Sequence, residues 1–204
     1  MARIRPLNDA ELVQRGVTLP DIAQPSGISL NNCMRTMARK PGLVEAMQRL
    51  ALVVMLDPSS VPAELKWLVA HVVSNAAGCR YCTAHTVYNG ARRTNLESAK
   101  IDSVWEFRTN ALFSAAERAA LELALAAGSA PPEVTDAHFA ELAQHYSEDQ
   151  IVDLVAVIAH FGWFNRWNDT MQSDLEDSSA RFGAAHEVAL GWKMGGDDPV
   201  SSKN

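Results

Sequence analysis

Apolar residues recur at three- and four-residue intervals along most of this chain, and the alternating patterns typical of strands are scarce. In residues 41–56 the repeat is carried by Leu43, Met47, Leu50, Val53 and Val54. Pro62 suits the first turn of the next helix, whose apolar positions run to about Ala77. The chain is therefore expected to fold as an all-α protein.

Local signals place the ends of these helices. A serine followed three residues later by Glu or Gln is a capping-box pattern, and it occurs at Ser114 and Ser147. Proline and glycine make the first 28 residues look irregular, and the polar residues 195–204 are expected to be a disordered tail of a single domain over residues 1–194. We expect helices over residues 31–40, 41–56, 62–77, 78–93, 96–110, 114–128, 132–145 and 147–171.

Two short apolar segments resemble each other. Residues 68–73 and 154–159 each lead through a glycine into a polar segment that bears aromatic residues. Apolar helices are alike in composition, so this likeness is only a weak indication of an internal duplication.

The composition excludes several classes of protein. With 204 residues, 48% of them apolar and 21% charged, the chain has the profile of an ordinary globular domain. Its net charge is −6 and its basic residues are spread out, so it lacks the positive stripe of a nucleic-acid binder. No apolar run reaches the roughly 20 residues of a membrane span, and the N-terminus lacks the apolar stretch of a secretion signal. A cytoplasmic protein without nucleic-acid or membrane partners is expected.

The residues that carry chemistry are Cys79, Cys82 and His85. Two cysteines three residues apart lie one helical turn apart, close enough to form a disulfide if the backbone allows it. His85 follows Cys82 by three residues, so on a helix it shares a face with Cys82 and can take its proton. The pattern predicts a redox thiol site with an attacking cysteine, a resolving cysteine and a base.

Two other interpretations of the cysteines stay open. A zinc site usually needs four ligands from two such pairs, and the only other cysteine is Cys33, far upstream. The pair could also be buried and inert, because free cysteine packs well in a core. We expect no bound metal and no cofactor, since a thiol cycle needs neither.

These residues resemble the carboxymuconolactone decarboxylase superfamily, in particular its alkylhydroperoxidase D-like, peroxidase-related branch. The likeness rests on Gly78 to Thr86, on the preceding Pro62 to Val69, and on Phe164 to Met171, and it covers about residues 25–180. It implies an all-α bundle around a helical hairpin that carries the Cys-x-x-Cys pair. It also implies a homo-oligomer, a trimer, hexamer or dimer.

For the redox members, the resemblance implies reduction of hydroperoxides through a disulfide cycle. By position, Cys82 is then the peroxidatic thiol, Cys79 the resolving thiol and His85 the base. An external thiol or a disulfide-reducing protein would restore the dithiol. The family places a proton-relay glutamate twelve residues before the first cysteine, where this chain has Trp67. Glu64 and His71, each about one turn away, are the candidate replacements.

A second group of candidate residues is aromatic and amide in character. Asn165 and Asn168 share one helix face beside several aromatic rings. These two residues, with Trp67 and Tyr81, are expected to line a pocket or a subunit contact.

The leading functional hypothesis is therefore a thiol-dependent hydroperoxide reductase that cycles a Cys79–Cys82 disulfide. One alternative is a disulfide reductase or redox sensor that acts on a protein partner. Another is a lyase of the carboxymuconolactone decarboxylase type, which would not need the cysteines. A helical scaffold that has lost its chemistry is the remaining alternative.

Overall fold

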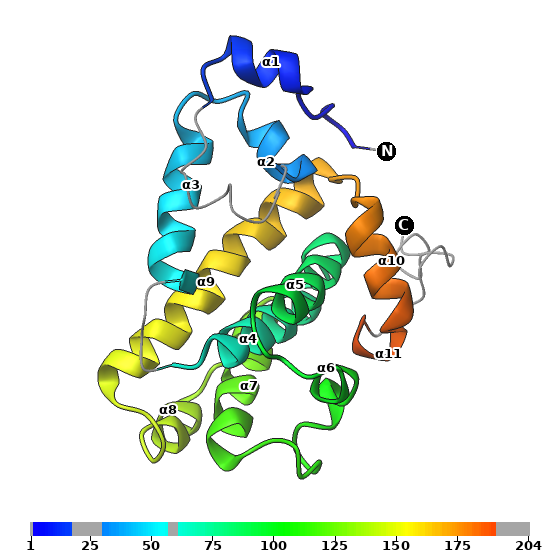
Figure 1. Ribbon diagram of the computed structural model, residues 1–204. Helices are drawn as coiled ribbons and strands as arrows, with labels where there is room; N and C mark the ends of the chain where they lie inside the picture. The colour runs from blue at the N-terminus through cyan, green and yellow to red at the C-terminus, as the bar shows by residue number, and fades with distance from the viewer. Residues whose placement is uncertain (1, 18–29, 57–60, 191–204) are drawn as a thin grey trace.

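The computed structural model describes residues 2–17, 30–56 and 61–190, and every regular element within these ranges is a helix (Figure 1). This confirms the expected all-α class. The helices are α1 (Asp9–Gln14), α2 (Asn32–Met37), α3 (Leu43–Ala51), the π-helix η2 (Leu52–Leu56), α4 (Ala63–Ala76), α5 (Arg80–Arg93), α6 (Ser98–Asp102), the 3₁₀-helix η3 (Val104–Glu106), α7 (Ala115–Gly128), α8 (Asp136–Leu142), α9 (Glu148–Met171), α10 (Asp177–Ala185) and α11 (Glu187–Leu190).

Both capping boxes expected from the sequence are present. The Ser114 side chain accepts a hydrogen bond from the Glu117 backbone N–H, and the Glu117 carboxylate accepts one from the Ser114 backbone in return. Ser147 and Gln150 make the same reciprocal pair at the start of α9. Each box satisfies two backbone N–H groups that have no partner inside the helix, which is why α7 and α9 begin where they do.

Three sequence expectations were wrong in detail. The first 28 residues are not wholly irregular, because Asn8 and Glu11 form a further capping box that starts α1. The stretch 96–110 is not one helix but α6 and η3, since this path buries Ile101, Val104 and Phe107 together. The helix expected over 132–145 is shorter, since α8 begins only after its N-cap residue Thr135.

A helical hairpin of α4 and α5 forms the centre of the molecule. The chain turns between them at Gly78, whose φ of +77° lies in the left-handed region that a residue with a Cβ rarely adopts. The backbone N–H groups of Gly78 and Cys79 donate to the carbonyls of Asn75 and Ser74, which closes the turn. Helices α7 and α9 pack against α4, whose residues from Leu65 to Ser74 are all buried. The hairpin implied by the resemblance is confirmed.

A buried lysine joins three elements beside this hairpin. Lys66 on α4 is 2% exposed, and its Nζ donates to the Val54 carbonyl of η2 at 2.8 Å. The same ammonium lies 3.3 Å from the Asp153 carboxylate on α9. Because a buried charge needs such partners, Lys66 fixes where η2 lies relative to α4 and α9. The expected helix over 41–56 begins as α3 but ends as the π-helix η2 rather than as a regular α-helix.

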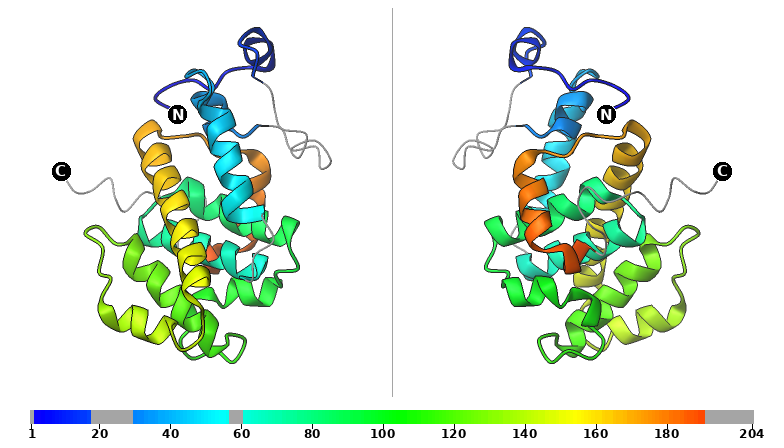
Figure 2. Two further views of the ribbon diagram at one scale, coloured as in Figure 1. Left: turned by 90° about the vertical axis from the view of Figure 1, so that its left-hand side faces the viewer. Right: turned by 90° about the vertical axis from the view of Figure 1, so that its right-hand side faces the viewer.

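The remaining helices lie around this core. Helix α1 lies at one end of the molecule and α8 at the other, as both side views show (Figure 2). Large apolar side chains stay exposed on α3, η2 and α9, among them Val53, Val152 and Trp163.

Homo-oligomer formation stays a prediction. The internal duplication also stays a prediction, and its two segments lie in α4 and α9, which pack together. The predicted tail, 195–204, falls outside the described residues, as do residues 57–60 between the expected helices 41–56 and 62–77. Within the described residues, no helix has both the length and the apolar character needed to cross a bilayer.

The contact between α7 and α4 yields a prediction for stability. A Cβ on Gly128 would lie 2.6 Å from the Ala76 Cβ and 2.8 Å from the Val73 carbonyl oxygen. Gly128→Ala is expected to lower the free energy of unfolding by about 1–3 kcal/mol, because backbone must shift to admit the methyl group. Urea unfolding monitored by circular dichroism measures this change.

Gly162→Ala is the matched control. Gly162 lies within α9, and its added Cβ meets nothing within 4 Å. Alanine there is expected to leave stability unchanged or raise it by up to ~1 kcal/mol. Equal effects of the two substitutions would contradict the close packing of α7 on α4.

Candidate thiol site

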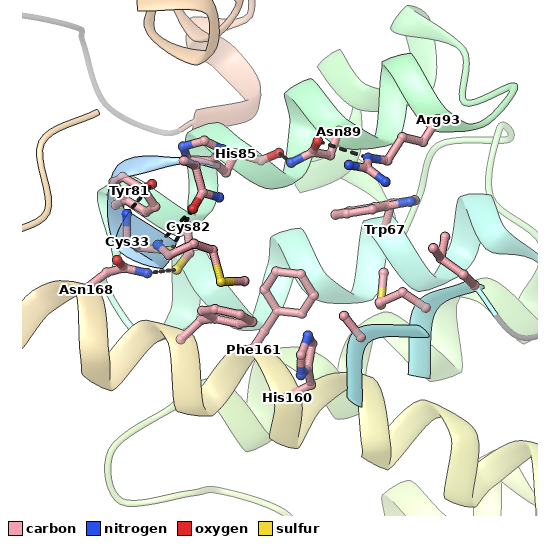
Figure 3. Close-up of a pocket in the computed structure, with 16 residues that line it drawn as sticks. Cys33, Trp67, Tyr81, Cys82, His85, Asn89, Arg93, His160, Phe161 and Asn168 are labelled. Atoms are coloured by element: carbon pink, nitrogen blue, oxygen red, sulfur yellow. Dashed lines mark hydrogen bonds between the residues drawn. The ribbon is translucent and has the colours of Figure 1, made fainter. Parts of the chain in front are cut away.

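One pocket opens onto the cysteine motif (Figure 3). Its cavity volume is about 180 Å³, and α5 and α9 provide most of its walls, with contributions from α2, α3, η2 and α4. Most of its wall is aromatic or aliphatic. The lining residues are Asn31, Cys33, Met34, Ala51, Met55, Leu56, Trp67, Tyr81, Cys82, His85, Asn89, Arg93, His160, Phe161, Phe164 and Asn168.

The two cysteines of the motif occupy different positions. Cys79 is the N-cap residue of α5, and its Sγ accepts a hydrogen bond from the Cys82 backbone N–H at 3.5 Å. Cys82 is in the first turn of α5 and lines the pocket, whereas Cys79 lies behind it and is not part of the wall. Both thiols are buried, and no disulfide joins them in this structure. This arrangement leaves Cys82 as the thiol of the pair that a ligand in the pocket meets first.

The surroundings of Cys82 favour its protonated thiol form. Burial raises the pKa of Cys82 well above its ordinary value, and its contacts with Cys79 raise it further. The Asn168 amide opposes this by donating from Nδ2 to the Cys82 Sγ at 3.3 Å. Asn168 on α9 is 2% exposed, and its Oδ1 has no hydrogen-bond partner among the described residues. A buried acceptor without a partner beside the sulfur suits a ligand that brings its own donor.

His85 belongs to a hydrogen-bonded network with Glu176, one residue before α10. The His85 Nε2 lies 2.5 Å from one Glu176 oxygen, and the other oxygen accepts from the Tyr81 hydroxyl at 3.0 Å. The Asn32 backbone N–H also donates to this carboxylate. The second ring nitrogen of His85 lies 3.3 Å from the Ser179 hydroxyl. The Tyr81 ring packs against the imidazole, with the two ring centroids 4.4 Å apart.

This network sets the charge state of Glu176. Burial alone would raise the pKa of the carboxyl, but the hydrogen bond and charge of His85, with the Asn32 N–H, hold it below the ordinary value. Glu176 is therefore ionised at neutral pH, and it fixes the orientation of the imidazole at the pocket wall.

Asp169 on α9 is a carboxylate that interacts with the second thiol, Cys79. Its side chain hydrogen-bonds Cys79. Burial raises the pKa of Asp169, while the Cys79 hydrogen bond and the charge of Arg166 oppose that rise. A carboxylate in this place can accept the proton of Cys79.

The structure brings most of the sequence candidates together, although it does not test their roles. Cys82, His85, Trp67, Tyr81 and Asn168 line the pocket, and Cys79 contacts Cys82 from behind. Asn165 is buried nearby on α9, but it is not part of the pocket wall.

Neither candidate relay residue reaches the pocket wall. Glu64 accepts a hydrogen bond from the Asn95 backbone N–H. His71 is enclosed between the Thr86 hydroxyl and the Ala189 carbonyl. The carboxylate that contacts His85 is Glu176.

The buried state of His71 predicts a loss of stability in acid. Burial lowers its pKa from 6.5 to about 4, so between these values the unfolded chain binds a proton that the folded chain does not. Stability is therefore complete above pH 6.5 and falls by roughly 3 kcal/mol as the pH drops to 4. The free energy of unfolding against pH should fall less steeply between pH 6.5 and 5 in His71→Gln. Parallel curves for the two proteins would contradict this assignment.

Sequence reasoning missed three functional candidates. Cys33 on α2 and His160 on α9 both line the pocket, and Glu176 contacts His85. Burial lowers the pKa of His160 to about 4, so this imidazole is neutral, and its buried Nδ1 has no partner among the described residues. An aromatic-rich segment was the only sequence signal near His160, and no local pattern links Cys33 or Glu176 to the motif.

The far end of the pocket differs from the thiol end. Figure 3 places Trp67, Asn89 and Arg93 there, away from Cys82. Arg93 donates to the Asn89 side chain at 3.2 Å, and burial together with nearby Arg92 lowers the pKa of the Arg93 guanidinium.

Within the described ranges, no group of three or more His, Cys, Asp or Glu side chains is arranged to hold a metal ion.

Comparison with known proteins gives a family and several relatives. Residues 41–126 match the profile of the carboxymuconolactone decarboxylase family. The uncharacterized protein YnjA of Escherichia coli K12 is 33% identical over 121 residues, which is 59% of this chain. The matched part spans 58% of the length of YnjA.

Solved structures extend the likeness over nearly the whole chain. The debrominase Bmp8 is 33% identical with a TM-score of 0.79, over 92% of this chain and 97% of Bmp8. A cysteine-to-alanine variant of Bmp8, similar to this chain to the same degree, has been solved in complex with 2,3,4-tribromopyrrole.

A peroxidase-related protein of Ralstonia eutropha JMP134 with an alkylhydroperoxidase core is 22% identical. Its TM-score is 0.70, over 87% of this chain and 94% of that protein, and it shows the fold alone. The α4–α5 hairpin, the Cys-x-x-Cys pair that it carries and these matches all indicate the same family. The chain belongs to the carboxymuconolactone decarboxylase family, with an alkylhydroperoxidase D-like fold.

Proposed function

We propose that the protein is a thiol-dependent reductase that removes bromine from a small heteroaromatic ring. The observation that carries the proposal is the position of Cys82 at the end of an aromatic pocket, with Cys79 in contact behind it. The whole-chain similarity to the debrominase Bmp8 supports the same chemistry.

The pocket suits a single aromatic ring. Its volume of about 180 Å³ is slightly larger than the apolar cavity of about 150 Å³ that holds benzene in a well-studied case. Phe161 and Phe164 offer ring faces and edges, and Trp67 closes the far end. Beside the sulfur, the unpartnered Oδ1 of Asn168 can accept a ring N–H. A brominated pyrrole presents such a donor next to its carbon–bromine bonds.

The proposed reaction consumes two thiols for each bromine removed. The Cys82 thiol gives its proton to His85, its sulfur takes the bromine as the carbon–bromine bond breaks, and the bonding pair stays on the ring carbon. That carbon then receives a proton, for which His85 is the donor at the pocket wall. Cys79 next attacks the brominated sulfur to form the Cys79–Cys82 disulfide, and bromide leaves. Asp169 accepts the proton of Cys79.

The sum is one aryl bromide and two thiols giving one arene, one disulfide, bromide and a proton. An external thiol, either small or part of a disulfide-reducing protein, then restores the dithiol by exchange. The external thiol that acts as reductant is itself proposed.

Reduction of an organic hydroperoxide is the second candidate, and the contact between Cys79 and Cys82 favours it equally. Here Cys82 would attack the peroxide oxygen to give a sulfenic acid, and Cys79 would condense with it to release water. The same pocket would hold the organic group. Lyase chemistry of the carboxymuconolactone decarboxylase type would not use the contact between these two thiols.

A steady-state comparison separates the two candidates. With dithiothreitol as reductant, bromide release from 2,3,4-tribromopyrrole is measured beside the consumption of cumene hydroperoxide. We expect kcat/KM for 2,3,4-tribromopyrrole to be at least tenfold larger than kcat/KM for cumene hydroperoxide. The reverse order would favour the hydroperoxide reductase.

A further inference from the structure

A third thiol, Cys33, lines the same pocket as Cys82. It lies on α2, in a part of the chain far from the motif, and it is 2% exposed. Of the two other cysteines, only Cys82 shares the pocket wall with it, because Cys79 lies behind α5's first turn. Figure 3 shows Cys33, Cys82 and Asn168 together at one end of the pocket. A substrate at Cys82 therefore meets two thiols.

Hydrogen bonds hold Cys33 in this position. Its Sγ donates to the Asn31 Oδ1 at 3.2 Å, and its backbone N–H donates to the Tyr81 hydroxyl at 3.3 Å. Tyr81 in turn donates to Glu176, so the backbone of Cys33 is tied to the network that orients His85. The thiol is thus fixed against the catalytic residues rather than packed loosely in the core.

One side chain lies beside both pocket thiols. The Asn168 amide donates to the Cys82 Sγ at 3.3 Å. Burial raises the pKa of Cys33 to about 12, and the same amide opposes that rise. Cys33, Cys82 and Asn168 all line the pocket, and Figure 3 draws them side by side at one end of it. The Asn168 Oδ1, buried and without a partner among the described residues, marks the space beside them as one that a ligand completes.

We propose that Cys33 is a second resolving thiol, which attacks oxidised Cys82 from the pocket side while Cys79 attacks from behind. The inference rests on the proposed function, in which Cys82 becomes oxidised. Once the Cys82 sulfur carries bromine, the Cys33 sulfur bonds to it and bromide leaves with the Cys33 proton. If Cys82 instead carries a hydroxyl group, water leaves. The product is a Cys33–Cys82 disulfide, and no further oxidant is consumed.

Cys79→Ser isolates the new route. Serine is a favourable N-cap residue, so α5 keeps its start while Cys79, the resolving thiol of the proposed function, is removed. The reduced variant is mixed with one equivalent of 2,3,4-tribromopyrrole and, separately, with diamide, which takes two electrons and two protons from a dithiol. After blocking with N-ethylmaleimide, peptide mass spectrometry is expected to find a Cys33–Cys82 disulfide in both samples.

The double variant Cys33→Ser/Cys79→Ser is the matched control. It should form no intramolecular disulfide, and its turnover of tribromopyrrole with dithiothreitol should be at least tenfold slower than that of Cys79→Ser. Circular dichroism confirms that each variant is folded, and Cys79→Ala replaces Cys79→Ser if the latter is not.

The two oxidants separate the inference from the function on which it rests. A Cys33–Cys82 disulfide with diamide but not with tribromopyrrole would overturn debromination and leave the pairing of these thiols intact. No such disulfide with diamide in a folded variant would overturn the proposal for Cys33. Equal turnover by the single and double variants would also overturn it.

Discussion

Cys82→Ser is expected to abolish bromide release from 2,3,4-tribromopyrrole, with a fall in kcat of at least about a thousandfold. Cys82 is the motif cysteine that faces the pocket, and a serine hydroxyl there cannot take up bromine and then exchange to a disulfide. Substrate binding should persist, because the aromatic walls are unchanged. Bromide release by ion chromatography and ligand binding by calorimetry measure the two properties separately.

Cys79→Ser gives the contrast for this experiment. Cys82 can still take up the bromine, and Cys33 on the same pocket wall can displace it, so the variant should still release one bromide per protein in the first event. Its later turnovers should be slower, because Cys82 has lost the partner in contact with it. Wild-type rates in Cys82→Ser would show that the reacting group is elsewhere.

Glu176→Gln is expected to lower kcat by roughly 10²- to 10⁴-fold and to leave KM almost unchanged. Glu176 is not part of the pocket wall; it acts through His85, whose Nε2 its carboxylate holds at 2.5 Å. The amide keeps the shape but replaces the ionised oxygen with a donor or a neutral acceptor. The imidazole then loses the partner that fixes its orientation for proton transfer. Steady-state kinetics on tribromopyrrole measure both constants.

Two further variants distinguish positioning from a general loss of structure. Glu176→Asp keeps the charge and should recover part of kcat, whereas a purely structural role would not favour it over glutamine. Glu64→Gln removes the carboxylate that the sequence suggested as a relay, and it should match the wild type, because Glu64 contacts Asn95 instead. A large loss in Glu64→Gln together with normal activity in Glu176→Gln would contradict the assigned network.

Short-range chemistry explains why so much of the fold could be predicted. The boxes at Ser114 and Ser147 involve residues three apart, so their sequence patterns contain all the partners that the structure uses. Gly78 and the Cys79 to His85 motif are also local, and they place two thiols and an imidazole on one turn-and-helix unit. The prediction of one helix over 96–110 was wrong because the path of this segment is decided by the burial of Ile101, Val104 and Phe107 rather than by helical periodicity.

The parts of the site that were missed depend on distant contacts. Glu176 lies 91 residues from His85, and Cys33 lies 48 residues from Tyr81, the residue whose hydroxyl binds its backbone. In sequence, Glu176 stands in an acidic stretch that looks like solvated surface, and Cys33 is a single cysteine. Only the packing of α2 and the start of α10 against α5 brings them to the motif. The relay candidates one turn from Trp67, Glu64 and His71, do not line the pocket, and their role stays a prediction.

The most direct test of the account is a single turnover of fully reduced protein with one equivalent of 2,3,4-tribromopyrrole. Bromide is counted by ion chromatography, and the cysteines are read by mass spectrometry after blocking. The account predicts one bromide per protein, an added ring proton in the product and a disulfide at Cys82. Thiols that stay reduced with no bromide released, while cumene hydroperoxide oxidises them at once, would contradict debromination and leave hydroperoxide reduction as the function of this pocket.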